Sequence, residues 1–265
     1  MELYTILIAF GLTMVAGLST GIGSIMAFFT KHTNTKFLSV SLGFSAGVMI
    51  YVSFMEMMPG AKENLTGRFG EWAGTLYMLL AFFGGMLFIN LIDFLIPEDK
   101  NPHEMRDISE LDKKQSGLKR TGLLVALSIG IHNFPEGIAT FTSALNSLEV
   151  ALPITFAIAI HNIPEGIAVS VPIYQATGNK KKAFWLSFLS GMAEPVGAFV
   201  GFLILIPFWT PSINGLILAA VSGIMVFISM DELLPSAQKY GEHHLSIIGL
   251  VTGMAIMATS LFLFI

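Results

Sequence analysis

Cysteine is absent from this chain of 265 residues, and charged residues are scarce. The missing thiols exclude disulfide bonds and thiolate metal ligands, so any metal chemistry must use nitrogen and oxygen donors. Aspartate, glutamate, lysine and arginine together make up 12% of the residues, whereas 54% are hydrophobic and the mean hydropathy is +0.73. Soluble domains carry about 25% charged residues. The composition therefore predicts an integral membrane protein and excludes a large soluble catalytic domain.

Eight long apolar stretches are separated by polar, glycine-containing or proline-containing breaks. A helix needs about 20 apolar residues to cross the hydrocarbon core of a bilayer, whereas a transmembrane strand needs about ten with strict alternation. The stretches therefore predict an all-α integral membrane protein with eight transmembrane helices. Their expected bounds are 3–29, 37–58, 72–96, 121–145, 150–174, 182–206, 212–234 and 245–265.

The 14 lysine and arginine residues are distributed unevenly, and they form no basic patch of the kind that binds nucleic acid. Twelve of them lie on one side of the predicted spans, and only Lys62 and Arg68 lie on the other. Basic residues near span ends stay on the cytoplasmic side, so both termini are expected outside. We expect residues 1–265 to form a single transmembrane domain with a mobile cytoplasmic loop at about 97–119.

Two internal repeats are present. The motif His132-Asn133-Phe-Pro-Glu136-Gly recurs 29 residues later as His161-Asn162-Ile-Pro-Glu165-Gly. The pattern Ser-x-x-Glu-x-x-Pro of residues 53–59 recurs at 229–235, and a weaker match pairs the first predicted span with the sixth. The offset of five spans is odd, so the second copy enters the membrane from the opposite side. This predicts a 3+2+3 arrangement in which spans 1–3 and 6–8 are inverted repeats.

Several carboxylates lie inside or at the ends of the predicted spans without a lysine or arginine beside them. An ionisable side chain near the bilayer centre costs about 2.5 to 3.5 kcal/mol, so helices keep one only where it faces the bundle interior and serves a function. Several such groups without a basic partner predict a bound cation. They are Glu56, Glu136, Glu165, Glu194, Asp231 and Glu232, with Asp93 near the end of the third span.

The repeated motif adds imidazole and amide groups to these carboxylates. Residues four apart share a helical face, so His132 projects with Glu136, and His161 projects with Glu165. Asn133 and Asn162 lie beside these pairs. If the two helices face one another, nitrogen and oxygen donors converge in a combination that suits Zn(II), Fe(II), Mn(II), Co(II) or Ni(II).

Glu194, immediately before a helix-breaking proline in the sixth predicted span, offers a third carboxylate to the same place. One divalent ion does not need three carboxylates, two imidazoles and two amides. The set of donors can therefore hold two metal ions bridged by Glu136 and Glu165.

The doubled His-Asn-x-Pro-Glu-Gly motif, in an eight-span chain with external termini and a long loop after the third span, resembles the ZIP (Zrt/Irt-like) divalent metal transporters. It is most similar to their bacterial ZupT-type branch. The resemblance implies uptake of Zn(II) across the cytoplasmic membrane into the cell. It implies Fe(II), Mn(II), Co(II) and Cd(II) as weaker substrates and no prosthetic group. Many relatives carry a histidine-rich loop after the third span, whereas His103 is the only histidine in that loop here.

The resemblance also implies a binuclear site and an elevator-type alternating-access mechanism. One ion would be held by His132, Glu136, His161 and Glu165, and the other by Asn133, Glu136, Asn162, Glu165 and Glu194. Spans 1, 4, 5 and 6 would move against a scaffold of spans 2, 3, 7 and 8. Four residues on the scaffold are then candidate groups of the transport pathway: Ser53, Glu56, Ser229 and Glu232.

A membrane-embedded di-metal carboxylate enzyme is the alternative interpretation. Its usual signature is Glu-x-x-His, and an intramembrane metallopeptidase would carry His-Glu-x-x-His; the motif found here is neither. Because an enzyme also leaves the inverted repeat unexplained, we expect a transporter. The sequence leaves open the choice between carrier and channel, proton coupling, the order of metal preference, and the oligomeric state, for which a homodimer is one option. It also leaves open whether His243 and His244 receive released metal or are surface residues without a role in transport.

Overall fold

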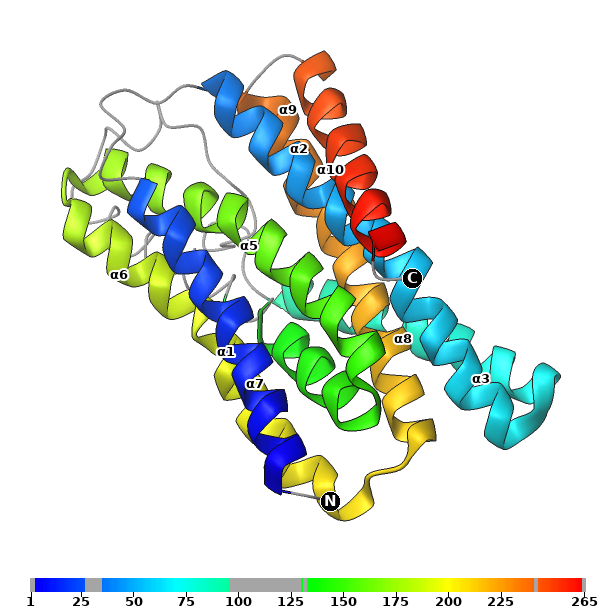
Figure 1. Ribbon diagram of the computed structural model, residues 1–265. Helices are drawn as coiled ribbons and strands as arrows, with labels where there is room; N and C mark the ends of the chain where they lie inside the picture. Colours follow the sequence, from blue (N-terminus) through cyan, green and yellow to red (C-terminus); the bar gives the residue numbers. More distant parts are fainter. Residues whose placement is uncertain (1–2, 27–34, 96–129, 131–132, 241–242, 264–265) are drawn as a thin grey trace.

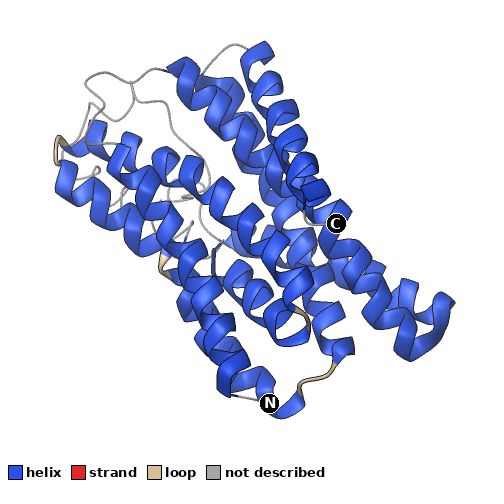
Figure 2. Cartoon of the chain, viewed as in Figure 1, coloured by secondary structure: helices blue, strands red, loops and turns tan. Residues whose placement is uncertain are grey.

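The computed structural model describes residues 3–26, 35–95, 130, 133–240 and 243–263, and every regular element in this part of the chain is helical (Figure 2). This agrees with the predicted all-α fold. The labelled α-helices are α1 (Leu3–Met26), α2 (Thr35–Val52), α3 (Met58–Leu95), α5 (Leu148–Thr177), α6 (Lys180–Gly191), α7 (Ala193–Leu205), α8 (Pro211–Ile228), α9 (Leu234–Tyr240) and α10 (His243–Leu263). The short helices are η1 (Ser53–Met57), η4 (Ile206–Phe208) and η5 (Ser229–Leu233), and residues 133–146 are also helical.

Within the described residues, six helical stretches are long and apolar enough to cross a membrane. They are Leu3–Ile25, Ser39–Ile92, Leu148–Ile167, Lys180–Leu205, Pro211–Gln238 and His243–Leu263. Five of them agree with the predicted spans 1, 5, 6, 7 and 8, and the second stretch covers the predicted spans 2 and 3 together. The first half of the predicted fourth span, apart from residue 130, lies outside the described residues, as does the 97–119 loop.

The Ser39–Ile92 stretch has 54 residues, and a straight helix of that length would measure about 80 Å, far more than a bilayer. The helix reverses direction instead. Gly70 has φ 78° and ψ 165°, a conformation that L side chains avoid. Beyond it the chain runs back alongside itself, so that the ring centroids of Phe54 and Phe82 lie 5.8 Å apart. The turn is visible at the lower right of Figure 1.

The segment 59–71 was expected to be a break between two spans, but the structure shows it to be helical up to this turn. The segment contains good helix formers such as lysine, glutamate and leucine, so its polar character does not prevent helix formation. Only Gly70 leaves the helical conformation. The helix therefore continues past the apolar stretch before the chain turns.

The helices form two groups that are distinguished by their contacts. Helix α1 packs on α5, α6 and α7, whereas α3 packs along α8, and α2 packs along α10 and α9. Helical residues 133–146 join the first group, because the Phe141 ring lies 4.8 Å from Phe10 and 6.1 Å from Phe202. We call α1, residues 133–146, α5, α6 and α7 the acidic body, and α2, α3, α8, α9 and α10 with η1 and η5 the apolar body. The two meet mainly where α2 packs against α5 (Figure 1).

The two bodies bury different side chains. The larger hydrophobic cluster is centred on the apolar body and includes Leu42, Met49, Leu65, Leu218 and Met225. A smaller cluster in the acidic body consists of four alanines and Phe141. The buried carboxylate and imidazole side chains that the structure describes all belong to the acidic body: Glu136, His161, Glu165 and Glu194.

Both copies of the Ser-x-x-Glu-x-x-Pro motif form a π-helical turn, η1 and η5, that begins at the serine. The backbone N–H of Met58 donates to the Ser53 carbonyl, and that of Leu234 donates to the Ser229 carbonyl, each five residues earlier in the chain. The proline that follows, Pro59 or Pro235, has no N–H and leaves a carbonyl of the preceding turn without its usual partner. The two halves of the chain thus share the same local structure at the positions that the repeat relates.

Candidate metal centre

Six of the seven predicted metal ligands belong to the described residues, whereas His132 lies outside them. Residues 133–146 contribute Asn133 and Glu136, α5 contributes His161, Asn162 and Glu165, and the first turn of α7 contributes Glu194. All six side chains are buried, with exposed fractions of 3% or less. Residues 133–146, α5 and α7 therefore place their ligand candidates in the interior of the acidic body.

Close helix approach at two glycines explains how these residues meet. A Cβ atom at Gly137 would collide with the backbone of Glu194, and one at Gly166 would collide with the backbone of Thr20 in α1. Each glycine directly follows a motif glutamate, so each close contact brings that glutamate to a helix interface. The glycines of the repeated motif thus allow the helices to approach closely at the candidate site.

A break between α6 and α7 places Glu194. Pro195 has no N–H and cannot continue the helical hydrogen-bond ladder to the carbonyl of Gly191. Helix α6 ends at that glycine, and α7 begins at Ala193. The predicted proline interruption is confirmed, and it puts Glu194 in the first turn of a new helix. In α5, by contrast, the helix runs unbroken through Pro164.

The two motif helices are linked directly through their predicted ligands. His161 Nε2 lies 3.4 Å from Glu136 Oε2, which joins the imidazole of one copy to the carboxylate of the other. The Asn133 side chain forms a hydrogen bond with Glu165 in the same crosswise manner, and its Nδ2 lies 3.4 Å from the Ser190 carbonyl oxygen. Each copy of the motif therefore contacts the other.

Asn162 links α5 to the other two helices. Its Nδ2 donates to Glu194 Oε1 and, at 2.9 Å, to the carbonyl oxygen of Ala16 in α1. Because both hydrogen bonds use the amide nitrogen, the amide oxygen is left for another partner. Sequence reasoning did not identify α1 as a wall of the site, since every residue has a backbone carbonyl and no motif marks this one.

Charge and unpaired polar atoms gather in this part of the acidic body. Glu136, Glu165 and Glu194 are close enough for their charges to interact. Among the described residues, His161 Nδ1, Asn162 Oδ1 and Glu194 Oε2 are buried and have no hydrogen-bond partner. Buried polar atoms are nearly always paired, and unpaired nitrogen and oxygen atoms beside several carboxylates are the donors that a divalent cation uses.

Among the described residues, the ligand candidates contact one another in pairs but do not form a complete metal-binding site. No group of three histidine or carboxylate side chains in the described ranges could hold a metal ion in this arrangement. The remaining predicted ligand, His132, is not among these ranges. The observed contacts between ligand candidates are the Glu136–His161, Asn133–Glu165 and Asn162–Glu194 pairs.

The candidate pathway residues occupy the two π-helical turns. Ser53 and Ser229 are buried, whereas Glu56 and Glu232 are half-buried. Glu232 is close enough to Glu165 for their charges to interact. Ser229 donates to the carbonyl four residues earlier at 2.7 Å, an ordinary helical contact, whereas Ser53 Oγ has no partner within the described part of the chain.

The two remaining histidines of interest, His243 and His244, lie at the start of α10 with exposed side chains. Their ring centroids are 5.8 Å apart. Neither residue belongs to the buried cluster.

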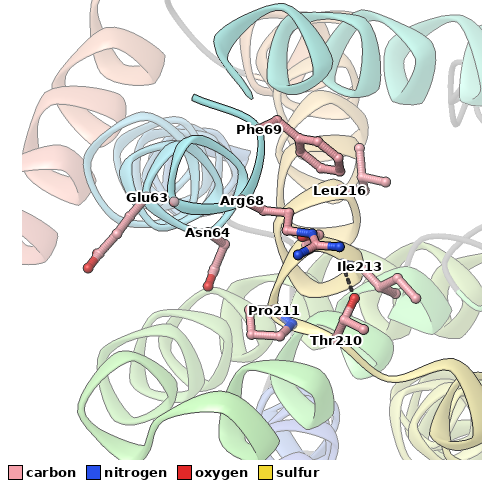
Figure 3. A pocket seen from close by; sticks show the side chains of 10 residues that line it. Glu63, Asn64, Arg68, Phe69, Thr210, Pro211, Ile213 and Leu216 are labelled. Atoms are coloured by element: carbon pink, nitrogen blue, oxygen red, sulfur yellow. Dashed lines mark hydrogen bonds between the residues drawn. The ribbon is translucent and has the colours of Figure 1, made fainter. Parts of the chain in front are cut away.

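A cavity of about 990 Å³ lies in the apolar body between α3 and the start of α8 (Figure 3). Its wall includes Glu63, Asn64, Arg68, Phe69, Thr210 and Leu216. The Thr210 hydroxyl caps α8 by accepting the backbone N–H of Ile213 at 3.2 Å. None of the predicted ligands lines this cavity, so it is separate from the acidic cluster.

Comparison with known proteins gives consistent results along the chain. Residues 96–260 match the family model described as ZIP zinc transporter. The chain is 62% identical over 257 residues to a protein of Streptococcus mutans named zinc transporter ZupT, covering 97% of each chain. It is 60% identical over 265 residues to a protein of the same name from Lysinibacillus sphaericus, with 98% of each chain covered. It is also 58% identical to a third from Clostridium perfringens, over 276 residues that cover 98% of this chain and 97% of the other.

Proposed function

The chain belongs to the ZIP zinc transporter family, and from this premise we propose that it carries zinc across the cytoplasmic membrane into the cell through a binuclear site. It is a multi-pass membrane transporter and not an enzyme, so the di-metal enzyme interpretation is set aside. The observation that best supports the site is the convergence of three buried glutamates with a histidine and two asparagines from three helices. Ionisable side chains in a membrane interior mark functional sites such as ion pathways, and a cluster of acids suits a cation.

Two overlapping ligand sets are proposed for the two ions. The first is His132, Glu136, His161 and Glu165, and the second is Asn133, Glu136, Asn162, Glu165 and Glu194. The contact between Glu136 and His161 supports the first set, and the contact between Asn162 and Glu194 supports the second. The first ion is bound more tightly, because imidazole nitrogen is a better ligand for zinc than an amide oxygen. Iron, manganese, cobalt and cadmium ions are weaker substrates in this proposal.

Eight transmembrane helices with both termini outside are proposed. The Ser39–Ile92 stretch supplies two of them because it reverses at Gly70, and residues 121–145 supply one more. The 97–119 segment is then a mobile cytoplasmic loop within a single domain, and spans 1–3 and 6–8 are inverted repeats. The matching π-helical turns of η1 and η5 support that relation. A homodimer stays a prediction.

An elevator-type mechanism is proposed on the basis of the two bodies. The helices of the acidic body are those expected to move, and the helices of the apolar body are those expected to form the scaffold. Helices α2 and α5 are in contact, and both contribute apolar side chains such as Ala46 and Ala157 to one hydrophobic cluster, which suits two surfaces that slide. Between the described residues of these two helices, the Ser45 hydroxyl donates only weakly to the His161 carbonyl oxygen, at 3.4 Å.

Uptake by proteoliposomes tests the proposed function. Purified protein is reconstituted into vesicles loaded with a zinc-sensitive dye, and zinc is added outside. We expect dye fluorescence to rise only in vesicles that contain the protein, and competing divalent ions to slow the rise. Folded protein that admits no zinc would rule out the proposal.

The absence of cysteine allows a direct test of orientation. Single cysteines in place of Ser147 and Lys181 are treated with an impermeant thiol reagent on intact cells. We expect Ser147→Cys to be labelled from outside and Lys181→Cys only after the membrane is opened. The reverse pattern would refute the proposed topology.

A further inference from the structure

A polar face continues beyond the motif along helical residues 133–146. Thr140 and Ser143 follow Glu136 by four and seven residues, so the three side chains share one face of the helix. Glu136 is 1% exposed, and Thr140 and Ser143 are fully buried. The face therefore extends the acidic site through the interior of the protein for two further helical turns.

The two hydroxyl groups on this face lack the usual partner. A serine or threonine inside a helix ordinarily donates to a carbonyl one turn earlier, as Thr142 does to Ala139 at 3.3 Å and Thr155 does to Ala151 at 2.7 Å. Thr140 Oγ1 and Ser143 Oγ have no hydrogen-bond partner among the described residues. Since an unpaired buried hydroxyl is costly, its retention at two successive turns points to a polar species that both hydroxyls contact.

The internal repeat shows that these hydroxyls are specific to one copy. At the corresponding positions 29 residues later, α5 carries Val169 and Pro172. The two helices are nearly identical through the motif and diverge immediately after it. The hydroxyls are therefore not a requirement of the motif fold, which α5 adopts without them.

The polar face ends at the surface. The helix ends at residue 146, where Asn146 is exposed, and Ser147 beyond it is partly exposed. Under the proposed topology this end of the helix is external. Glu136, Thr140 and Ser143 thus form a line from the acidic site toward the outside.

We propose that Thr140 and Ser143 line the external approach to the metal site. The incoming, partly hydrated divalent cation contacts their hydroxyl oxygens before it binds the Glu136 carboxylate. This inference rests on the proposed transport function and extends it to residues outside the motif. Hydroxyl oxygens are neutral and bind zinc weakly, so an ion can pass them without being trapped, whereas additional carboxylates would hold it. In this structure the face is buried, so the approach opens only in another conformation of the transport cycle.

Removal of the hydroxyls at constant shape is the first test. Thr140→Val reproduces the residue of the second copy, Ser143→Ala removes only the oxygen, and Thr142→Val is the matched control because its hydroxyl is already paired. We expect the double variant to lower the initial rate of zinc uptake about tenfold. Zinc affinity by calorimetry should stay within about twofold of wild type, since the ligands remain. The control should transport as wild type does.

Cysteine accessibility gives an independent test in the cysteine-free chain. Ser143→Cys should react with a small impermeant thiosulfonate added outside, and zinc should slow that reaction. Thr142→Cys, on another face of the same helix, should react at least about tenfold more slowly. A cysteine at 143 that is unreactive, or no more reactive than the one at 142, would overturn the proposal.

The two hypotheses fail in different ways. If wild-type vesicles admit no zinc, the proposed function fails. If wild type transports zinc and the double variant transports it at the same rate, only the external approach is wrong. If the variant loses zinc affinity as well as rate, the hydroxyls are structural parts of the site itself and not of its approach.

Discussion

The acidic body and the apolar body present similar apolar exteriors but have different interiors. On the surface of the apolar body, Leu80, Leu87 and Phe94 are 61%, 69% and 83% exposed, and on that of the acidic body Leu7 and Leu203 are 60% and 57% exposed. Such surfaces suit contact with lipid. The buried glutamates and the buried histidine of the described chain, by contrast, are all in the acidic body.

This difference separates the tasks of packing and binding. Van der Waals contacts among leucine, methionine and isoleucine stabilise the apolar body whether or not metal is present. The acidic body carries several like charges and unpaired polar atoms, which the proposed cation would stabilise. We therefore expect substitutions in the two bodies to change different measured quantities.

The largest expected effect is the loss of a bridging charge in the acidic body. Glu165→Ala should lower zinc uptake by more than about a hundredfold, because the residue belongs to both proposed ligand sets. The measurement is initial uptake in dye-loaded vesicles. The matched control is Glu149→Ala, which removes an exposed carboxylate from the first turn of the same helix and should leave uptake unchanged. Equal uptake by both variants would remove Glu165 from the site.

A paired substitution tests the separation of binding from packing. His161→Ala should weaken zinc binding by about ten- to a hundredfold in calorimetry and change the melting temperature little. Leu218→Ala, in the centre of the apolar body, should lower the free energy of unfolding by about 2 to 4 kcal/mol and leave zinc affinity as it is. Loss of zinc affinity in Leu218→Ala at a temperature where the protein is folded would show that the bodies are coupled.

A smaller effect is expected from Glu194→Gln, which keeps the size of the side chain and removes its charge. Only the second ligand set uses Glu194, so the number of zinc ions bound should fall from two to one while the tighter ion remains. Anomalous scattering at the zinc edge from crystals of the variant measures this. Two fully occupied peaks would exclude Glu194 from the site, and none would show that the two ions bind only as a pair.

The smallest effect is expected at the contact between the bodies. Ser45→Ala removes a hydroxyl that lies 3.4 Å from the His161 carbonyl oxygen, a long and weak hydrogen bond. The free energy of unfolding should change by less than about 0.5 kcal/mol, and zinc uptake should stay within about twofold of wild type. A large change in uptake with unchanged stability would show that this contact controls movement of one body against the other.

Local features of the sequence predicted the helices and the positions of the ligand candidates. A helix in a membrane must satisfy its own backbone hydrogen bonds, so the length of an apolar stretch is enough to identify a span. The spacing of histidine and glutamate within each motif then places them on one helical face. Pro195, which cannot donate a backbone hydrogen bond, likewise predicted an interruption of the sixth span near Glu194, but only the structure shows that the helix ends at Gly191.

Contacts between helices could not be read from the sequence, because they depend on which surfaces meet. The packing of Gly137 on α7 and of Gly166 on α1, the part that the Ala16 carbonyl takes in holding Asn162, and the unpaired hydroxyls beyond Glu136 appear only in the folded chain. An all-helical membrane protein with candidate metal ligands spaced along its helices follows from the sequence alone, since helix formation and residue spacing are local. Which backbone carbonyls and hydroxyls surround those candidate ligands depends on the folded structure, since residues far apart in the chain must come into contact.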